Sequence, residues 1–239
     1  MDNATRMYRA IKQERLHIIK KCHFEWDFDA KDGVDGLYES KAQCLSYAAT
    51  IGNLEIVKYF VSKGADVAYR NSECLQRSIC SRSLSKSVAV FNYLVSVGAD
   101  PLAQEKSYNA QGAMGLWGAT STLYWAAQFN NVDIVKACIE VGCDVSFNNH
   151  CAFKAAAENK SFDVMAYLLR EVLPADFIET SKVIKEIRDP LWHSDMKEVR
   201  DWFDENEETI VAENKIIAAH RSLSGKLEDK KERRSTRKI

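Results

Sequence analysis

The sequence has few residues that break helices and no long apolar run. Its 239 residues include only 3 prolines and 10 glycines, a content that fits a mostly helical chain better than a sheet with many turns. No stretch approaches the roughly 18 consecutive apolar residues that a membrane-spanning helix needs, and the first twelve residues contain no apolar leader. We therefore expect a soluble all-α protein with no membrane partner.

The chain also lacks an excess of charge of one sign. Lys and Arg number 33 and Asp and Glu number 34, so the formal net charge is −1. A near-neutral surface argues against a whole-surface affinity for nucleic acid or lipid, so any charged partner must be recognised locally. The one basic run is the C-terminal segment 226–239, where three acidic residues interrupt the basic ones and no aromatic residue is present to stack on bases.

Motifs for catalysis or ligand binding are absent as well. No phosphate-binding glycine loop, dinucleotide fingerprint, H-E-x-x-H helix or G-x-S-x-G elbow occurs. The seven cysteines form no C-x-x-C pair and no zinc spacing with histidine. We therefore expect no enzyme activity, no cofactor and no metal. A reducing compartment is the simplest context, which predicts a cytoplasmic protein, including the cytoplasm of a host cell.

What the sequence does contain is an internal repeat. One thirteen-residue pattern of two alanines, a polar turn and an apolar helix occurs three times, at 48–60, 126–138 and 156–168. A turn of the type Gly-Ala-Asp-Val follows it at 64–67 and recurs at 98–101 and 142–145. Glycine at these places is typical of the end of a helix, and the apolar residues before it have helical spacing.

The repeat length is about 33 residues. The apolar residues that open each second helix are Leu16, Leu54, Val88, Val132, Phe162 and Met196. Successive differences between these positions are 38, 34, 44, 30 and 34. The largest difference precedes Val132 and predicts an insertion between Pro101 and Ser121.

A helix with paired alanines, a Gly-Asn turn, a Leu-Glu-Ile-Val-Lys helix and then Gly-Ala-Asp resembles the ankyrin repeat. The resemblance implies an all-α ankyrin-repeat solenoid of about six helix pairs over residues 1–203. The expected units lie near 4–35, 36–70, 71–105, 106–149, 150–174 and 175–203. A C-terminal capping helix is expected over 204–224 and a charged, disordered tail over 225–239.

The chain departs from the ankyrin pattern where that family has Thr-Pro-Leu-His. The three corresponding stretches are Gln43-Cys44-Leu45-Ser46, Ser121-Thr122-Leu123-Tyr124 and Cys151-Ala152-Phe153-Lys154. The apolar third position is kept, but the threonine and histidine hydrogen bonds that the family uses are lost. We therefore expect looser fingers between repeats. Cys44, Cys74, Cys138 and Cys143 occupy apolar positions of the repeat and should be buried.

The third unit has two possible registers. Its first helix begins either at Leu75, followed by a long loop through Ser81–Ser85, or near Ile79, which would place Arg82 at a small-residue position. Burial of an unpaired arginine is costly, so the sequence favours the first register.

The resemblance implies that a partner binds on the concave face, which is made by the hairpin fingers and the first helix of each repeat. The residues expected to contact a protein are Tyr69, Arg70, Tyr108, Trp117, Gln128, Phe129, Phe147 and Asn148. Tyr, Trp and Arg dominate binding energy at protein interfaces, and an apolar insertion favours a covered position. The insertion over 101–121 is the predicted principal contact.

Two functional hypotheses follow. The first is a non-catalytic adaptor or inhibitor that binds another protein. The degenerate repeats resemble those of large DNA viruses, phages and intracellular bacteria, which implies interference with host or defence machinery. The alternative is a nucleic-acid-associated factor that uses the basic C-terminal tail.

Overall fold

A computed structural model of the chain describes residues 3–25, 40–80, 84–103, 121–174, 176–189 and 196–236. These residues form helices and turns, and no strand occurs among them. The chain divides into two compact units, Met1–Ala152 and Phe153–Ile239. The all-α prediction is confirmed.

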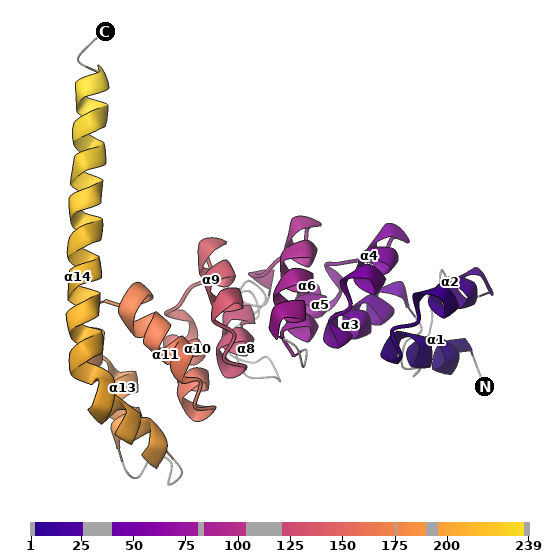
Figure 1. The fold of residues 1–239 in the computed structure, drawn as a ribbon, viewed down its shortest axis with the longest axis horizontal. Helices are drawn as coiled ribbons and strands as arrows, with labels where there is room; N and C mark the ends of the chain where they lie inside the picture. The colour runs from indigo at the N-terminus through magenta and orange to yellow at the C-terminus, as the bar shows by residue number, and fades with distance from the viewer. Residues whose placement is uncertain are drawn as a thin grey trace. The chain divides into compact units, whose positions relative to one another are not determined.

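The first unit is built from helix pairs in two layers (Figure 1). Its helices are α1 (Asn3–Lys12), α2 (Leu16–Glu25), α3 (Lys41–Ile51), α4 (Leu54–Ser62), α5 (Tyr69–Ile79), α6 (Leu84–Ser96), α8 (Thr122–Gln128) and α9 (Val132–Glu140). Within each pair the two helices pack together, and the first helices α1, α3, α5 and α8 each contact the next. The second helices α4, α6 and α9 form a parallel row. This is the two-layer arrangement of an ankyrin-repeat solenoid.

The sequence sets the start of these helices through polar caps. Ser40 and Gln43 form a reciprocal capping box at the beginning of α3. Asn53 and Asn131 each accept a hydrogen bond from the backbone N–H three residues later, at 3.2 and 3.1 Å, and so begin the second helices α4 and α9. Each cap satisfies a backbone donor that has no partner within the helix.

One backbone position with positive φ recurs between the two helices of a pair. It is held by Glu14, Gly52, Asn130 and Lys160, with φ of 55, 78, 53 and 56°. The same left-handed turn therefore connects the helices of four pairs, although only one of the four residues is glycine. This shared geometry shows that the N-terminal pair α1 and α2 has the same register as the clearer repeats.

A second recurring turn follows each second helix. Asp66, Asp100 and Asp144 each accept a hydrogen bond through Oδ1 from the backbone N–H two residues later, at 2.8–2.9 Å. This is the Asx turn that short acidic side chains favour. The glycine two positions before each aspartate, such as Gly98 at φ 101°, has a conformation that side chains rarely adopt.

Apolar residues at repeat positions form the interior of the first unit. The alanine pairs 48–49 and 126–127 are fully buried, which allows the two helices of each pair to pack closely. Phe60 and Phe91 are also buried at 0 and 1% exposure. Cys44, Cys74, Cys138 and Cys143 are buried, as predicted from their register, and all seven cysteines are free.

The third helix pair differs in part from both sequence registers. Ile79 is the last residue of α5, so a first helix that begins near Ile79 is excluded. The right-handed part of α5 follows Ser72, two residues earlier than the predicted start at Leu75. The second helix α6 already begins at Leu84, so the predicted loop through Ser85 is too long. Leu84 and Ser85 can join the helix because nothing between them and Val88 interrupts a helical conformation.

The second unit contains the remaining short helices and one long helix. α10 (Phe147–Glu158) extends into it, and it is followed by α11 (Phe162–Tyr167), the π-helical segment η1 (Leu168–Val172), α12 (Phe177–Thr180), α13 (Lys182–Arg188) and α14 (Lys197–Thr236). α14 contacts η1 and α13. The ring of Trp202 on α14 stacks on Phe162 with centroids 5.5 Å apart. These contacts make α14 the cap of this unit.

Asn214 explains how α14 holds the π-helical segment. The N–H of Leu173 donates to the carbonyl of Leu168, so the π-type partner of the next carbonyl, Leu169, would be Pro174, which has no N–H. The Nδ2 of Asn214 donates instead to Leu169 O at 2.5 Å and to Leu173 O at 3.0 Å. The buried amide of Asn214 thus replaces the donor that proline removes.

α14 differs from the boundaries expected at this end of the chain. The predicted sixth repeat ended at residue 203, the capping helix at 224 and the disordered tail began at 225. The structure has one continuous helix from Lys197 to Thr236. The segment after Gly225 is rich in Lys and Arg and contains two Glu, all strong helix formers, and it contains no proline.

Candidate protein-binding face

The predicted contact residues of the first finger lie in a left-handed turn. Arg70, Asn71 and Ser72 have φ of 49, 57 and 59°, and the regular helix begins after them. Arg70 is exposed, and its guanidinium lies 5.2 Å from the ring centroid of Tyr69. Tyr69 is half-buried. The structure therefore brings Tyr69 and Arg70 together at one exposed corner.

The finger at Phe147 and Asn148 has the same backbone conformation as the finger at Tyr69 and Arg70, but its aromatic side chain is more deeply buried. Asn148, Asn149 and His150 have φ of 47, 54 and 56° and so repeat the turn at 70–72. Asn148 is exposed, as predicted. Phe147, however, is only 8% exposed, so the expectation that it faces water is wrong. Its ring serves as a hydrophobic anchor for the finger, because burial of a phenylalanine is strongly favourable.

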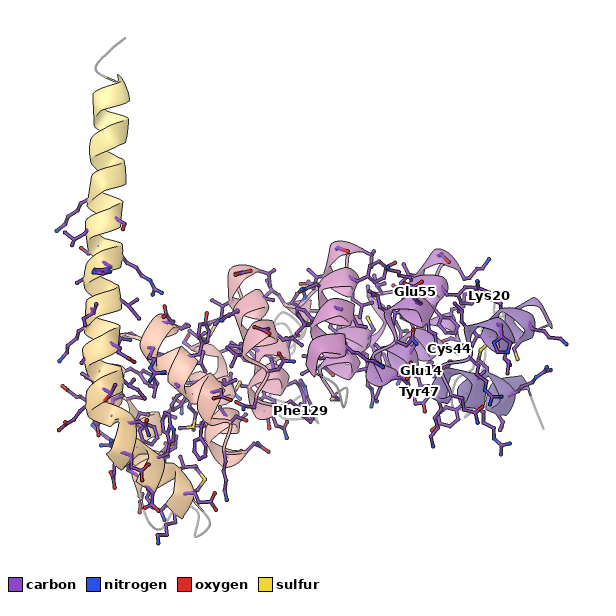
Figure 2. All side chains as sticks on the ribbon, in the orientation of Figure 1. Glu14, Lys20, Cys44, Tyr47, Glu55 and Phe129 are labelled. Carbon is purple, nitrogen blue, oxygen red and sulfur yellow. The ribbon has the colours of Figure 1, made fainter. Side chains whose placement is uncertain are left out.

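The predicted first-helix residues Gln128 and Phe129 lie at the end of α8. Phe129 is 41% exposed, which is unusual for a large apolar side chain in this unit (Figure 2). Trp125 lies four residues earlier on the same helix face. It is half-buried, and its buried Nε1 has no hydrogen-bond partner among the described residues. Sequence reasoning missed Trp125, although its spacing from Phe129 was a visible signal.

Tyr108 and Trp117 lie outside the described residues, as does most of the insertion over 101–121. Its two ends are described. The hydroxyl of Thr122 donates to the carbonyl of Pro101 at 2.8 Å, so the insertion leaves and re-enters the solenoid at one place. A loop whose ends are already joined in this way can be long at little cost to the repeats.

Consecutive fingers of the first unit are joined by a further hydrogen bond. The backbone N–H of Asp100 donates to Ser72 Oγ at 3.0 Å, and Ser72 is 2% exposed. Ser72 and Thr122 are thus two hydroxyl groups that link neighbouring repeats. The expectation of looser fingers stays a prediction.

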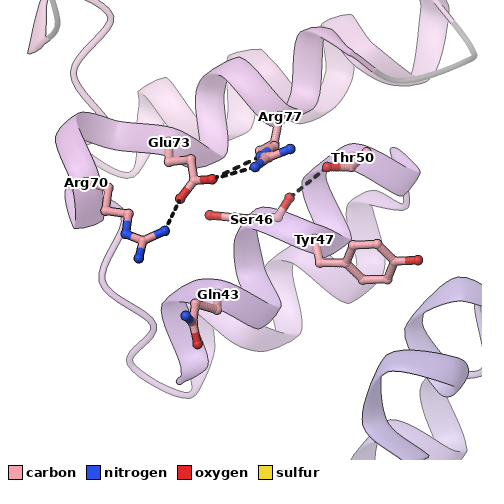
Figure 3. Close-up of a pocket in the computed structure, with 7 residues that line it drawn as sticks. All are labelled: Gln43, Ser46, Tyr47, Thr50, Arg70, Glu73 and Arg77. Atoms are coloured by element: carbon pink, nitrogen blue, oxygen red, sulfur yellow. Dashed lines mark hydrogen bonds and ion pairs between the residues drawn. The ribbon is translucent and has the colours of Figure 1, made fainter. Parts of the chain in front are cut away.

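The first helices carry most of the polar side chains on this face. Glu73 and Arg77 on α5 face Gln43, Ser46, Tyr47 and Thr50 on α3 across a pocket of about 220 Å³ (Figure 3). None of these side chains is among the residues predicted to contact a protein. Glu73 and Arg77 are four residues apart in the right-handed part of α5, so they share one face of the helix, whereas Arg70 reaches Glu73 from the left-handed turn.

The titratable groups give no sign of a catalytic centre among the described residues. Burial raises the pKa of both Cys44 and Cys74 to about 12, so neither thiol ionises near neutral pH. The Nδ1 of His150 lies 3.1 Å from the carbonyl of Val145, a bond that holds the finger in place. Across the described ranges, no group of three or more His, Cys, Asp or Glu is arranged to hold a metal ion. No helix in this part of the chain is both long and apolar enough to cross a membrane.

Comparison with known proteins also identifies an ankyrin repeat in the first unit. The ankyrin repeat family model matches residues 43–72, which run from the first turn of α3 through α4 to the left-handed turn at the start of α5. Alpha-latroinsectotoxin-Lt1a of Latrodectus tredecimguttatus is 33% identical over 129 residues, which cover 51% of this chain. Alpha-latrocrustotoxin-Lt1a of the same species is 32% identical over 125 residues, which cover 49%. The matched part spans only 8% of the length of either relative.

The matched repeat can be aligned with other helix pairs of the chain through its turn and cap positions. Its positive-φ position recurs at Glu14, Asn130 and Lys160, its Asx turn at Asp100 and Asp144, and the cap of its second helix at Asn131. Ankyrin repeats typically bind other proteins and typically have no catalytic role. The chain therefore contains an ankyrin repeat at residues 43–72 within an all-α helical solenoid, and a repeat of this kind supports a general role as a scaffold for protein binding.

Proposed function

We propose that this chain is a non-catalytic adaptor or inhibitor that binds a partner protein through the first-helix face of its first unit. This face comprises α1, α3, α5 and α8, together with the finger at 69–72 and the turn at 98–103. The insertion over 101–121 joins the finger layer at Pro101 and is part of the proposed contact.

The observation that carries this proposal is the exposure of Phe129. Large apolar side chains in the first unit are otherwise buried or half-buried among the described residues, except Val141 at 42% on the second-helix side. Phe129 lies one helical turn after Trp125, whose indole N–H is buried and has no hydrogen-bond partner in the described part of the chain. An exposed phenylalanine beside a tryptophan is the composition of an interface anchor.

The neighbouring first helices extend this surface. The Tyr47 ring on α3 lies 4.4 Å from the Tyr8 ring on α1, measured between centroids. Arg70 and Tyr69 occupy the finger at the start of α5. α1, α3, α5 and α8 each contact the next helix, so these aromatic and arginine side chains belong to successive members of one helix layer. A layer of this kind suits an extended partner segment that crosses several repeats.

The class of partner is a further part of the proposal. The degenerate Thr-Pro-Leu-His positions resemble those of ankyrin repeats in large DNA viruses, phages and intracellular bacteria. This resemblance supports a partner that belongs to host or defence machinery. It does not distinguish an adaptor from an inhibitor, which differ only in whether the bound partner stays active.

Site-specific photocrosslinking in the cell that makes the protein tests this function. A photoreactive phenylalanine at Phe129 should yield a defined crosslinked protein that mass spectrometry can identify. The matched control places the same residue at the exposed Lys136 on α9, in the second-helix layer. Crosslinks to the same protein at Lys136 alone would contradict the proposal. A Trp117→Ala/Tyr69→Ala variant that keeps every partner would contradict the part played by the finger and the insertion.

The alternative of nucleic-acid binding through the tail has less support. The backbone of 226–236 continues the helix of α14, and the sequence there has no aromatic residue for base stacking. A chain that ends at Ser224 should therefore shift an oligonucleotide in a gel to the same extent as the full chain. Loss of a shift on truncation would favour the alternative.

A further inference from the structure

The pocket between α3 and α5 has an unequal set of charges. Seven residues line it, and Arg70, Arg77 and Glu73 are the only charged ones among them. Arg70 and Arg77 lie on either side of Glu73 (Figure 3). The lining therefore has one carboxylate for two guanidinium groups and an excess of one positive charge.

The contacts of Glu73 leave donors of both arginines available. Nε and Nη2 of Arg77 both donate to one oxygen, Glu73 Oε1, at 3.0 and 2.9 Å. Arg70 Nη1 lies 3.8 Å from the other oxygen, which is an ion pair without a short hydrogen bond. A guanidinium has five N–H donors, so one carboxylate cannot saturate two of them.

Exposure places these donors on the open side of the pocket. The Arg70 and Arg77 side chains are 63 and 54% exposed, whereas the Glu73 side chain is 17% exposed. Glu73 therefore lies at the base, and the two guanidinium groups project past it towards solvent. An incoming anion would meet both cations before it approached Glu73.

The opposite wall of the pocket is held in place by its own hydrogen bonds. Gln43 Oε1 accepts from the Ser40 backbone N–H at 3.1 Å, and the Thr50 hydroxyl donates to Ser46 O at 3.1 Å. Both bonds hold side chains of α3 against their own helix. A preformed wall lowers the entropy that a ligand must lose on binding.

We propose that this pocket binds a glutamate or aspartate side chain of an acidic segment of the partner protein. The inference rests on the proposed function and names the chemistry that the partner must carry at α3 and α5. A carboxylate can bind a guanidinium through two parallel N–H···O bonds. The volume of about 220 Å³ is suited to one side chain.

A nucleic-acid backbone fits the same site less well. Successive phosphates require a track of cations, whereas this pocket presents one pair of arginines. Glu73 lies between the two arginines and would repel a second negative group. Its position therefore favours a single carboxylate that binds the solvent-facing N–H groups of Arg70 and Arg77. The acidic peptide is therefore the better match.

Fluorescence anisotropy with fluorescein-labelled hexaglutamate tests the proposal on the full chain. Hexaglutamate should bind at least about tenfold more tightly than hexaglutamine at low salt, because charge-assisted bonds are screened only at higher ionic strength. The Arg70→Gln/Arg77→Gln variant should lose most of this difference. Glu73→Gln should strengthen hexaglutamate binding, because it removes the competing carboxylate while the arginines remain.

The control removes two positive charges from the second-helix layer. Lys58→Gln/Lys63→Gln on and after α4 changes the net charge by the same amount and should leave hexaglutamate binding within about twofold of the unmodified chain. Equal losses in both double variants would overturn the proposal, and so would an Arg70/Arg77 variant with unchanged binding. Circular dichroism checks that each variant keeps the helical fold.

A labelled oligothymidylate of twelve nucleotides tests whether the pocket binds a nucleic-acid backbone instead. If the same two arginines bind it as tightly as hexaglutamate, the assignment to an acidic peptide is wrong. Failure of hexaglutamate binding with retained crosslinking at Phe129 would overturn this inference alone. Failure of both experiments would overturn the proposed function as well.

Discussion

The backbone N–H of Asp100 donates to the hydroxyl of Ser72 across two repeats, at 3.0 Å. Ser72 is buried and has a φ of 59°, so its backbone adopts a strained conformation at the place where its side chain accepts this bond. One residue therefore fixes the finger at the start of α5 and links it to the turn before the insertion.

Replacement of this hydroxyl should destabilise the first unit. Ser72→Ala would leave the Asp100 N–H without its partner in a part-buried position, at a cost of about 1–3 kcal/mol. Urea unfolding followed by circular dichroism measures the change. Ser96→Ala is the matched control, since the exposed Ser96 hydroxyl donates to the carbonyl of Tyr93 within its own helix. A loss in Ser72→Ala no larger than in Ser96→Ala would show that the link between repeats contributes little.

The glycine of the recurring turn should resist substitution for a conformational reason alone. Gly142 has φ 93°, and an added Cβ would meet no atom within 4 Å. Gly142→Ala should therefore cost about 1–2 kcal/mol through backbone strain without any steric clash. Gly142→Asn should cost less, because asparagine tolerates positive φ better than alanine. Equal costs for the two variants, measured by thermal unfolding, would contradict this explanation.

The sequence alone could predict the repeat register because each unit repeats the same local requirements. The second helices that begin at Leu16, Leu54, Val132 and Phe162 are all where the pattern placed them. The alanine pairs and the buried cysteines also follow from the register, since a helix pair packs closely only where side chains are small. These features depend on residues near one another in the chain.

The sequence could not predict which finger residues face water. Tyr69 and Phe147 occupy the same position of the left-handed turn, yet Tyr69 is half-buried and Phe147 is buried. The difference depends on neighbours from other repeats, which periodicity does not reveal. For the same reason the pocket formed by Arg70, Glu73 and Arg77 opposite α3 was not predicted, because it needs the packing of two first helices.

Asn214 should be the most sensitive polar residue of the second unit. Asn214→Ala would remove the donor to both Leu169 O and Leu173 O, and would leave buried carbonyl groups unpaired at a cost of about 1–3 kcal/mol for each. The long helix α14 should then separate more easily from η1. Hydrogen exchange of the amides in 162–173 measures this release.

Asn206 offers the control for that substitution. Its Nδ2 donates to Trp202 O at 2.8 Å within α14 itself, so Asn206→Ala removes a bond of the same chemistry that joins no two elements. Faster exchange over 162–173 should occur in Asn214→Ala and not in Asn206→Ala. Equal protection in both variants would show that the apolar contacts of Phe203 and Ile210 hold the helix without the amide.

The buried thiols predict how stability depends on pH. Desolvation raises the pKa of Cys44 and Cys74 from an ordinary value of 9.0 to about 12 in the folded chain. Between pH 9 and 12 the unfolded chain has lost these protons while the folded chain keeps them, so the free energy of unfolding must fall as pH rises. Below pH 9 both states are protonated and the two thiols contribute no pH dependence.

Urea unfolding of the full chain should therefore show a lower free energy of unfolding at pH 10.5 than at pH 8. This decrease should be smaller in a Cys44→Ala/Cys74→Ala variant. The comparison remains valid if alanine lowers stability at both pH values, because only the difference between them reports the thiols. An identical decrease in both proteins would mean that these cysteines ionise at their ordinary pKa and are not buried.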